Sequence, residues 1–151
     1  MSAPIKLYEF GASRSIRCRW LLTELALPFE SVIVNLREGE HRGEAYRKIN
    51  PYGRVPALVD GDLVLFESVA ICIYLADRYG RGSLIPAAGT PQRGLHDQWL
   101  LFTGVELDQV LWRIHCHERI YPPEKRIPEA AALARAQFPG VAEVLTDAGA
   151  G

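Results

Sequence analysis

Hydrophobic residues at the start of the chain are spaced first as a strand and then as a helix. Residues 5–10 form a short run of β-forming side chains. Residues 14–27 then carry apolar side chains at helical positions, namely Ile16, Trp20, Leu21 and Leu25. Pro28 is expected to break this helix, and the apolar centre of residues 29–35 predicts a second strand. Strands joined by a helical crossover are expected to lie parallel.

After this unit the chain is predicted to turn back on itself. Residues 36–48 are highly charged, which favours an exposed loop and a short helix. The Asn50–Gly53 segment is a turn, and residues 55–59 predict a strand interrupted by Pro56. A tight Asp-Gly turn joins that strand to residues 63–66. This hairpin should make the sheet partly antiparallel.

The rest of the chain has helical spacing. Residues 68–79 predict a helix that begins with Ser68 as its N-cap, stops at Gly80 and is apolar on nearly every side. Such a helix is covered on both faces. We expect a first domain at 1–82, a glycine- and proline-rich linker at 83–90, and a helical domain at 91–151.

Prolines divide the helical domain. One long helix is expected from Pro91 to about His117, where the sequence Tyr-Pro-Pro soon follows, and another from Pro128 to about Ala148. Pro139 is expected to kink the second helix. The aromatic and leucine side chains of the first have spacings that suit a helical interface: Trp99, Phe102, Leu107, Leu111 and Trp112.

Composition and charge narrow the class of protein. Hydrophobic residues make up 48% and charged residues 23%, as in ordinary globular proteins. The net charge of -1 gives no reason to expect nucleic acid or an anionic membrane as partner. The N-terminus has no secretory pattern and no apolar run is long enough to span a membrane, so a cytoplasmic location is expected. Cys18, Cys72 and Cys116 are odd in number and widely spaced, which argues against disulfides.

The order β-α-β-α-β-β-α, with a proline at the start of the third strand, is the thioredoxin-like pattern. Within it, the segment NPYGRVPALVDGDLVLFES resembles the cytosolic glutathione S-transferase family, in particular its serine-type bacterial, theta-like or phi-like members. The resemblance covers essentially the whole chain and is most specific in the first domain. It implies an α/β thioredoxin-like domain followed by an all-α domain that is incomplete, because family members continue with several more helices.

The resemblance implies a glutathione site at two short motifs. Pro56 stands where the family has a cis-proline, and the Val55 main chain would pair with glutathione as with an added strand. The alternative is an edge-strand proline that prevents pairing. Ser68, at a helix N-terminus, would hold the γ-glutamyl carboxylate while Glu67 faces the ammonium group. The alternative for Glu67 and Ser68 is a simple helix cap.

The thiol-activating hydroxyl is assigned to Ser13. In serine-type members this hydroxyl lies four positions before an arginine, which matches Ser13 and Arg17. A hydroxyl that donates to sulfur beside a helix N-terminus favours the thiolate. Ser13 could instead be only an N-cap, and Ser15 is the rival for the catalytic role because the usual proline after the serine is missing. Cys18 is assigned to the core.

Three basic residues suit the glycyl carboxylate of glutathione. His41 and Arg42 precede the Asn-Pro turn at the family's spacing, and Arg54 stands next to Val55. The alternative for all three is an exposed, solvated surface. The run from His115 to Glu118 superficially suggests a metal site, but adjacent helical residues point in different directions, so no metal is expected.

The expected activity is transfer of glutathione, as co-substrate and without another cofactor, to a hydrophobic electrophile. The expected assembly is a homodimer, by resemblance only. The alternatives are a glutathione-dependent reductase or isomerase, which usually has a cysteine at the position of Ser13, and a non-catalytic binding or interaction protein with the same fold.

Overall fold

A computed structural model describes residues 4–11 and 13–149 of the chain. The chain divides into two compact units, Met1–Arg93 and Gly94–Gly151. The elements of the first unit are β1 (Ile5–Glu9), α1 (Ser15–Glu24), β2 (Phe29–Ile33), η1 (Glu40–Arg42), α2 (Glu44–Arg47), β3 (Ala57–Asp60), β4 (Leu63–Phe66) and α3 (Ser68–Tyr79). The predicted thioredoxin-like α/β order βαβαββα is confirmed.

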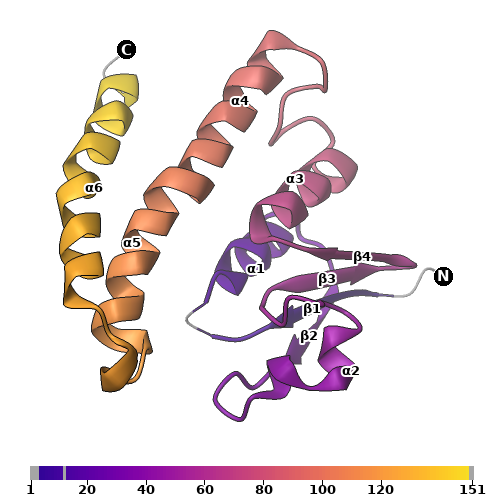
Figure 1. The fold of residues 1–151 in the computed structure, drawn as a ribbon. Helices are drawn as coiled ribbons and strands as arrows, with labels where there is room; N and C mark the ends of the chain where they lie inside the picture. Colours follow the sequence, from indigo (N-terminus) through magenta and orange to yellow (C-terminus); the bar gives the residue numbers. More distant parts are fainter. Residues whose placement is uncertain (1–3, 12, 150–151) are drawn as a thin grey trace. The chain divides into compact units, whose positions relative to one another are not determined.

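The first unit is built on a four-stranded mixed sheet with the order β2-β1-β3-β4. β1 is parallel to β2 and antiparallel to β3, and β3 is antiparallel to β4. The predicted change of direction after the charged segment is therefore confirmed. In Figure 1, α1 and α3 lie on one face of the sheet and α2 lies on the other.

Successive side chains of β1 point to opposite faces of the sheet, and each face has its own apolar cluster. Ile5 and Leu7 are buried under α1 and α3 with Cys18, Leu58 and other apolar residues. A smaller cluster on the side of α2 contains Val34, Tyr46 and Ala57. Cys18 is fully buried, so its assignment to the core is confirmed. All three cysteines are free.

The buried face of α1 is not the one that the spacing of large apolar residues suggested. Ile16 and Trp20 are 62% and 71% exposed, whereas Ser15, Cys18 and Leu22 are buried. Cys18 and Leu22 belong to the core cluster that also contains Ile71 and Leu75 of α3, so this face of α1 points inward. α1 also ends at Glu24, before Pro28, because Ala26 has a positive φ of 51°.

Two predicted boundaries at the sheet are corrected. β3 begins at Ala57 rather than at residue 55, and Val55 and Pro56, which are joined by a cis peptide bond, lie outside the ladder. Ser68 is the first residue of α3 and not its N-cap. The N-cap is Glu67, whose carbonyl oxygen accepts the first helical hydrogen bond from the Ile71 N–H at 3.0 Å.

The helical part consists of α4 (Pro91–Phe102), η2 (Thr103–Leu107), α5 (Asp108–His115), η3 (Cys116–Ile120), η4 (Pro123–Lys125) and α6 (Pro128–Gly149). The single long helix predicted from Pro91 is continuous in Figure 1, but η2 and η3 are wider π turns. The Thr103 hydroxyl bonds back to the carbonyls of Trp99 and Leu100, which explains a local departure from α geometry at η2. α6 continues past Pro139.

Candidate functional site

Three strand ends meet at one edge of the sheet. Tyr8, near the end of β1, pairs with Ala57 at the start of β3, and Ala57 pairs with Phe66 at the end of β4. The loop that follows β1, the segment that precedes β3 and the start of α3 therefore lie side by side. These are the places that hold Ser13, Val55 and Ser68.

The loop after β1 is closed by two serine hydroxyls. Ser13 Oγ donates to the Phe10 carbonyl oxygen at 2.6 Å and accepts from the Ser15 N–H at 3.2 Å. Ser15 Oγ lies 2.8 Å from Ser13 Oγ and accepts from the Phe10 N–H at 3.4 Å. Ser13 is half-buried and Ser15 is 1% exposed. Of these two residues, Ser13 is the one with surface open to solvent.

The N-terminus of α3 offers main-chain donors. The helix ladder starts with the bond from Ile71 to Glu67, so the N–H groups of the three preceding helical residues have no intrahelical acceptor. Glu67 makes no side-chain cap and its φ is 73°. Free N–H groups and the helix dipole together favour a bound carboxylate.

Two side chains of α1 connect it to the start of α3. Arg17 Nη1 donates to Ser68 Oγ at 3.3 Å. The Cys18 thiol donates to the Ser68 carbonyl oxygen at 3.7 Å. The hydrogen bond with Cys72 and burial raise the pKa of Cys18, so this residue stays a thiol. Ser68 Oγ accepts from a cation and keeps its own proton, which it can donate to an anion.

Side chains on α2 and on the turn after it donate hydrogen bonds to the segment that precedes β3. Tyr46 Oη donates to the Arg54 carbonyl oxygen at 2.6 Å, and Asn50 Nδ2 donates to the same oxygen at 2.7 Å. Asn50 is 2% exposed and its Oδ1 accepts from the Tyr52 N–H. Burial raises the pKa of Tyr46 to about 12, so it remains a donor at neutral pH. Both lone pairs of the Arg54 carbonyl are thus used within the protein.

The loop that contains His41 packs against the same turn. A Cβ atom at Gly53 would lie 2.7 Å from the His41 carbonyl oxygen, and φ at Gly53 is 65°, so both the close approach and the conformation require glycine. Arg42 Nε donates to His41 Nε2 at 3.2 Å, which places the imidazole proton on Nδ1. His41 Nδ1 is buried without a hydrogen-bond partner among the described residues.

The charge of His41 follows from its surroundings. Burial and, after it, the neighbouring Arg42 lower the pKa of His41. The imidazole is therefore a neutral donor at neutral pH, whereas Arg42 carries the charge. Arg54 is exposed, and its guanidinium lies over the Tyr52 ring, 4.6 Å from the centroid. This stacking fixes the direction of Arg54 beside Val55.

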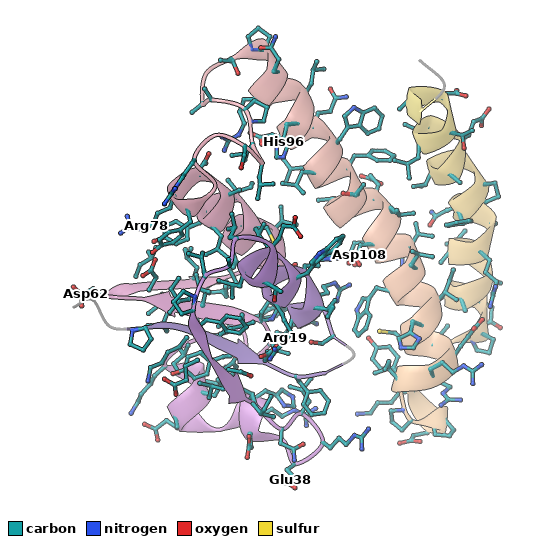
Figure 2. The ribbon with its side chains drawn as sticks, turned by 180° about the vertical axis from the view of Figure 1, so that it is seen from behind. Arg19, Glu38, Asp62, Arg78, His96 and Asp108 are labelled. Carbon is teal, nitrogen blue, oxygen red and sulfur yellow. The ribbon has the colours of Figure 1, made fainter. Side chains whose placement is uncertain are left out.

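A buried carboxylate anchors α1 beside the serine loop. Glu9, 4% exposed, forms a two-pronged ion pair with Arg19 and accepts a hydrogen bond from the Ser31 hydroxyl at 2.5 Å. Arg19 extends from α1 toward the sheet in Figure 2. Because Glu9 directly precedes Phe10, this ion pair holds the main chain to which both serines bind.

Sequence reasoning missed the residues that support the site. Tyr46 and Asn50 lie in or beside a segment predicted to be exposed, although an apolar ring within a charged stretch was a signal of burial. Glu9 and Arg19 were also missed. A carboxylate in register with the buried Ile5 and Leu7 was the available signal, because alternate strand residues share a face.

The run from His115 to Glu118 has structural partners. His117 Nδ1 accepts the Ile127 N–H, Glu118 pairs with Arg135, and Cys116 is buried. Across residues 4–11 and 13–149, no three or more histidine, cysteine or acidic side chains are grouped so as to hold a metal ion. Within the same residues, none of the helices has the length and hydropathy that crossing a membrane requires.

Comparisons with known proteins identify the family. The family described as "Glutathione S-transferase, N-terminal domain" matches residues 3–77. Glutathione S-transferase Z2 of Arabidopsis thaliana is 44% identical over 86 residues, which are 56% of this chain and 39% of that protein. Glutathione S-transferase theta-1 of Mus musculus is 35% identical over 128 residues, or 80% of this chain and 52% of that one.

A solved structure extends the similarity to the helical part. The structure of glutathione S-transferase-I bound with lactoylglutathione has a TM-score of 0.77 and 31% identity, and the match covers 95% of this chain and 69% of that one. The fold and the arrangement of its strand ends define a thioredoxin-like domain with a helical extension. The chain belongs to the glutathione S-transferase family. It spans about 39% to 52% of the two curated relatives named above.

Proposed function

We propose that this protein binds glutathione and transfers it to electrophilic small molecules. The observation that carries the proposal is the meeting of Ser13, the cis Val55–Pro56 segment and Ser68 at one edge of the sheet. Each supplies a different part of what a γ-linked tripeptide needs. The named relatives and the lactoylglutathione complex support the same activity.

In the proposed complex, glutathione is held along its length. Its γ-glutamyl carboxylate accepts from the first N–H groups of α3 and from the Ser68 hydroxyl, and Glu67 faces the ammonium group. The main chain of its cysteinyl residue pairs with the N–H and C=O of Val55, which Pro56 holds outside the ladder. Since the Arg54 carbonyl is already saturated, Val55 is the residue of this segment that remains for such pairing.

The glycyl carboxylate is assigned to the basic groups at the other end of this segment. Arg42 and Arg54 supply charge, and His41 supplies a neutral N–H. Binding a carboxylate would give His41 Nδ1 an acceptor, directly or through water.

The chemical step needs a thiolate. A free thiol with a pKa near 8.5 is mostly protonated at neutral pH, and a hydrogen bond from Ser13 stabilises its ionised form. The thiol proton leaves to solvent, the sulfur lone pair forms a bond to the electrophilic carbon, and the leaving group departs with its bonding electrons. Ser13 keeps its own proton throughout and acts as a donor to sulfur.

Three further expectations remain parts of the proposal. The electrophile would be a hydrophobic small molecule, the protein would form a homodimer, and it would act in the cytoplasm. A reductase would need an accessible cysteine in the loop that holds Ser13, whereas the cysteine of α1, Cys18, is fully buried with a raised pKa. This observation favours conjugation over thiol-disulfide exchange.

The test combines binding and turnover. The protein is passed over glutathione-agarose, eluted with free glutathione, and assayed for conjugation of 1-chloro-2,4-dinitrobenzene. Retention with turnover is expected. Retention without turnover would instead support the non-catalytic binding protein, and failure to bind glutathione would reject both.

A further inference from the structure

Two serine hydroxyls meet in the loop between β1 and α1. The sequence presents Ser13 and Ser15 as rivals for one role, but their oxygens are only 2.8 Å apart. Each also contacts a different main-chain group of Phe10, the Ser13 hydroxyl at the carbonyl oxygen and the Ser15 oxygen at the N–H. The two side chains therefore belong to one hydrogen-bonded unit.

The number of available protons determines which hydroxyl donates to the other. A hydroxyl has one proton and two lone pairs. The Ser13 proton is used in the short 2.6 Å bond to the Phe10 carbonyl oxygen. Because Ser13 has only one proton and its contact with the Phe10 carbonyl is the shorter of the two, we assign the proton between the hydroxyls to Ser15, whose own oxygen accepts from the Phe10 N–H. In this arrangement Ser13 Oγ accepts from both the O–H and the N–H of Ser15, and no donor is left over.

We propose that Ser15 is a positioning residue that holds Ser13 Oγ and strengthens it as a donor to the glutathione sulfur. The proposal rests on the proposed function and goes beyond it. When sulfur enters the site, the Ser13 proton turns from the Phe10 carbonyl toward it, while two bonds from Ser15 keep the oxygen in place. A hydroxyl that accepts a hydrogen bond is polarised and donates more strongly.

Burial excludes a direct role for Ser15. With 1% of its surface exposed, it cannot reach a ligand that the half-buried Ser13 contacts. Its effect on the bound thiol has to pass through Ser13. That dependence can be measured, because a residue that only supports the fold would act whether or not Ser13 is present.

The test is a double-mutant cycle of native protein, Ser13→Ala, Ser15→Ala and the double variant. The readouts are the ultraviolet absorbance of bound glutathione thiolate against pH and the pH profile of kcat/KM. Ser15→Ala is expected to raise the apparent pKa of bound glutathione by about half to one unit and to lower kcat/KM about three- to tenfold below neutral pH. The loss should shrink at high pH, where the thiol ionises unaided.

In the Ser13→Ala background, Ser15→Ala should change the thiolate profile less than about twofold. Equal effects in the two backgrounds would overturn the inference and make Ser15 a purely structural residue. A thiolate signal that survives Ser13→Ala but not Ser15→Ala would also overturn it, by making Ser15 the activating residue. Native protein without any thiolate signal would instead reject the proposed function itself.

Two further variants guard against simple misfolding. Ser15→Cys keeps the size of the side chain but has a weaker donor, so it is expected to give a shift between those of native protein and Ser15→Ala. Thr23→Ala removes another hydroxyl of α1, one that bonds only to the Arg19 carbonyl, and should leave the profile unchanged. A Ser15→Cys profile identical to native would count against the proposal.

Discussion

The two helices that begin at the site differ in what their first residues offer. α1 starts after a closed loop in which the polar groups of Ser13 and Ser15 are bonded to one another and to Phe10. α3 starts with open N–H groups and a Ser68 hydroxyl that accepts from Arg17. The first arrangement can orient one donor accurately, whereas the second can surround an anion. Under the proposed function, the start of α1 serves the reaction and the start of α3 serves binding.

The strongest way to test that separation is Ser13→Ala. Removing a single donor to a developing anion typically costs about 10²- to 10³-fold in rate. We expect kcat/KM for 1-chloro-2,4-dinitrobenzene to fall by that order, while calorimetry shows glutathione affinity changed less than about threefold, because the α3 contacts remain. A loss of affinity as large as the loss of rate would show that the two helix starts do not divide the work.

Ser68→Ala should have the opposite signature. A hydrogen bond to a charged group contributes about 1.5–3 kcal/mol, so Kd for glutathione should rise roughly tenfold or more. The pH dependence of the bound thiol should stay as in native protein. The measurement is calorimetric titration with glutathione. The control ligand is a peptide that lacks the γ-glutamyl carboxylate, and native and variant proteins should bind this peptide with the same affinity.

The helices also differ in how the sheet anchors them. α1 is held by the ion pair of Glu9 with Arg19, whereas Asp60 accepts hydrogen bonds from Tyr74 and Tyr79 of α3. Glu9→Gln should lower the free energy of unfolding by about 1–2 kcal/mol, since Arg19 keeps access to water while losing its buried partner. Thermal unfolding followed by circular dichroism measures the change.

Glu30→Gln is the matched control for that experiment. Glu30 pairs with Lys6 at the surface, with side chains 50% and 39% exposed, and exposed pairs contribute less than about 1 kcal/mol. Equal destabilisation by the two substitutions would contradict the anchoring role of Glu9.

The anchor of α3 should be sensitive to acid. Burial opposes ionisation of Asp60, but hydrogen bonds from Tyr79 and Tyr74, with the nearby Arg78, more than compensate and lower its pKa. A lowered folded-state pKa contributes stability above the ordinary aspartate range, and this is lost as pH falls through the folded value. Asp60→Asn should therefore cost about 1 kcal/mol near neutral pH and progressively less in acid.

Unfolding curves across the acid range check this prediction. Asp62→Asn, on the exposed turn of the same hairpin, serves as the control and should leave stability unchanged at every pH (Figure 2). If the loss of stability caused by Asp60→Asn stays constant down to strong acid, the charge of Asp60 is not what anchors α3.

Sequence reasoning succeeded where local rules and tertiary structure agree. The bounds of α3 follow from an apolar run that ends at a glycine, and the strand directions follow from the crossover and the tight turn. Sequence reasoning failed where tertiary packing determines which of two similar apolar faces is buried. The inward face of α1 carries Cys18 and Leu22, whereas Ile16 and Trp20, at equally suitable helical spacing, are exposed.

The placement of the candidate site residues was predictable in part. The positions of Val55, Pro56 and Ser68 came from a motif whose spacing is fixed by the hairpin. The support from Tyr46 and Asn50 could not be predicted, because both bond to a main-chain carbonyl whose position depends on how α2 folds back on the sheet. The partnership of Ser13 with Ser15 likewise depends on loop geometry.

The backbone of Glu67 has a consequence for how this protein can be improved. Its φ of 73° and ψ of 112° are strained for a residue with a side chain, at a cost of order 1–3 kcal/mol. Replacing Glu67 with glycine should raise the melting temperature while weakening glutathione binding. Under the proposed function, selection for heat resistance alone would thus tend to remove the side chain that faces the ammonium group of glutathione, so stability and affinity would be in direct trade-off at this position.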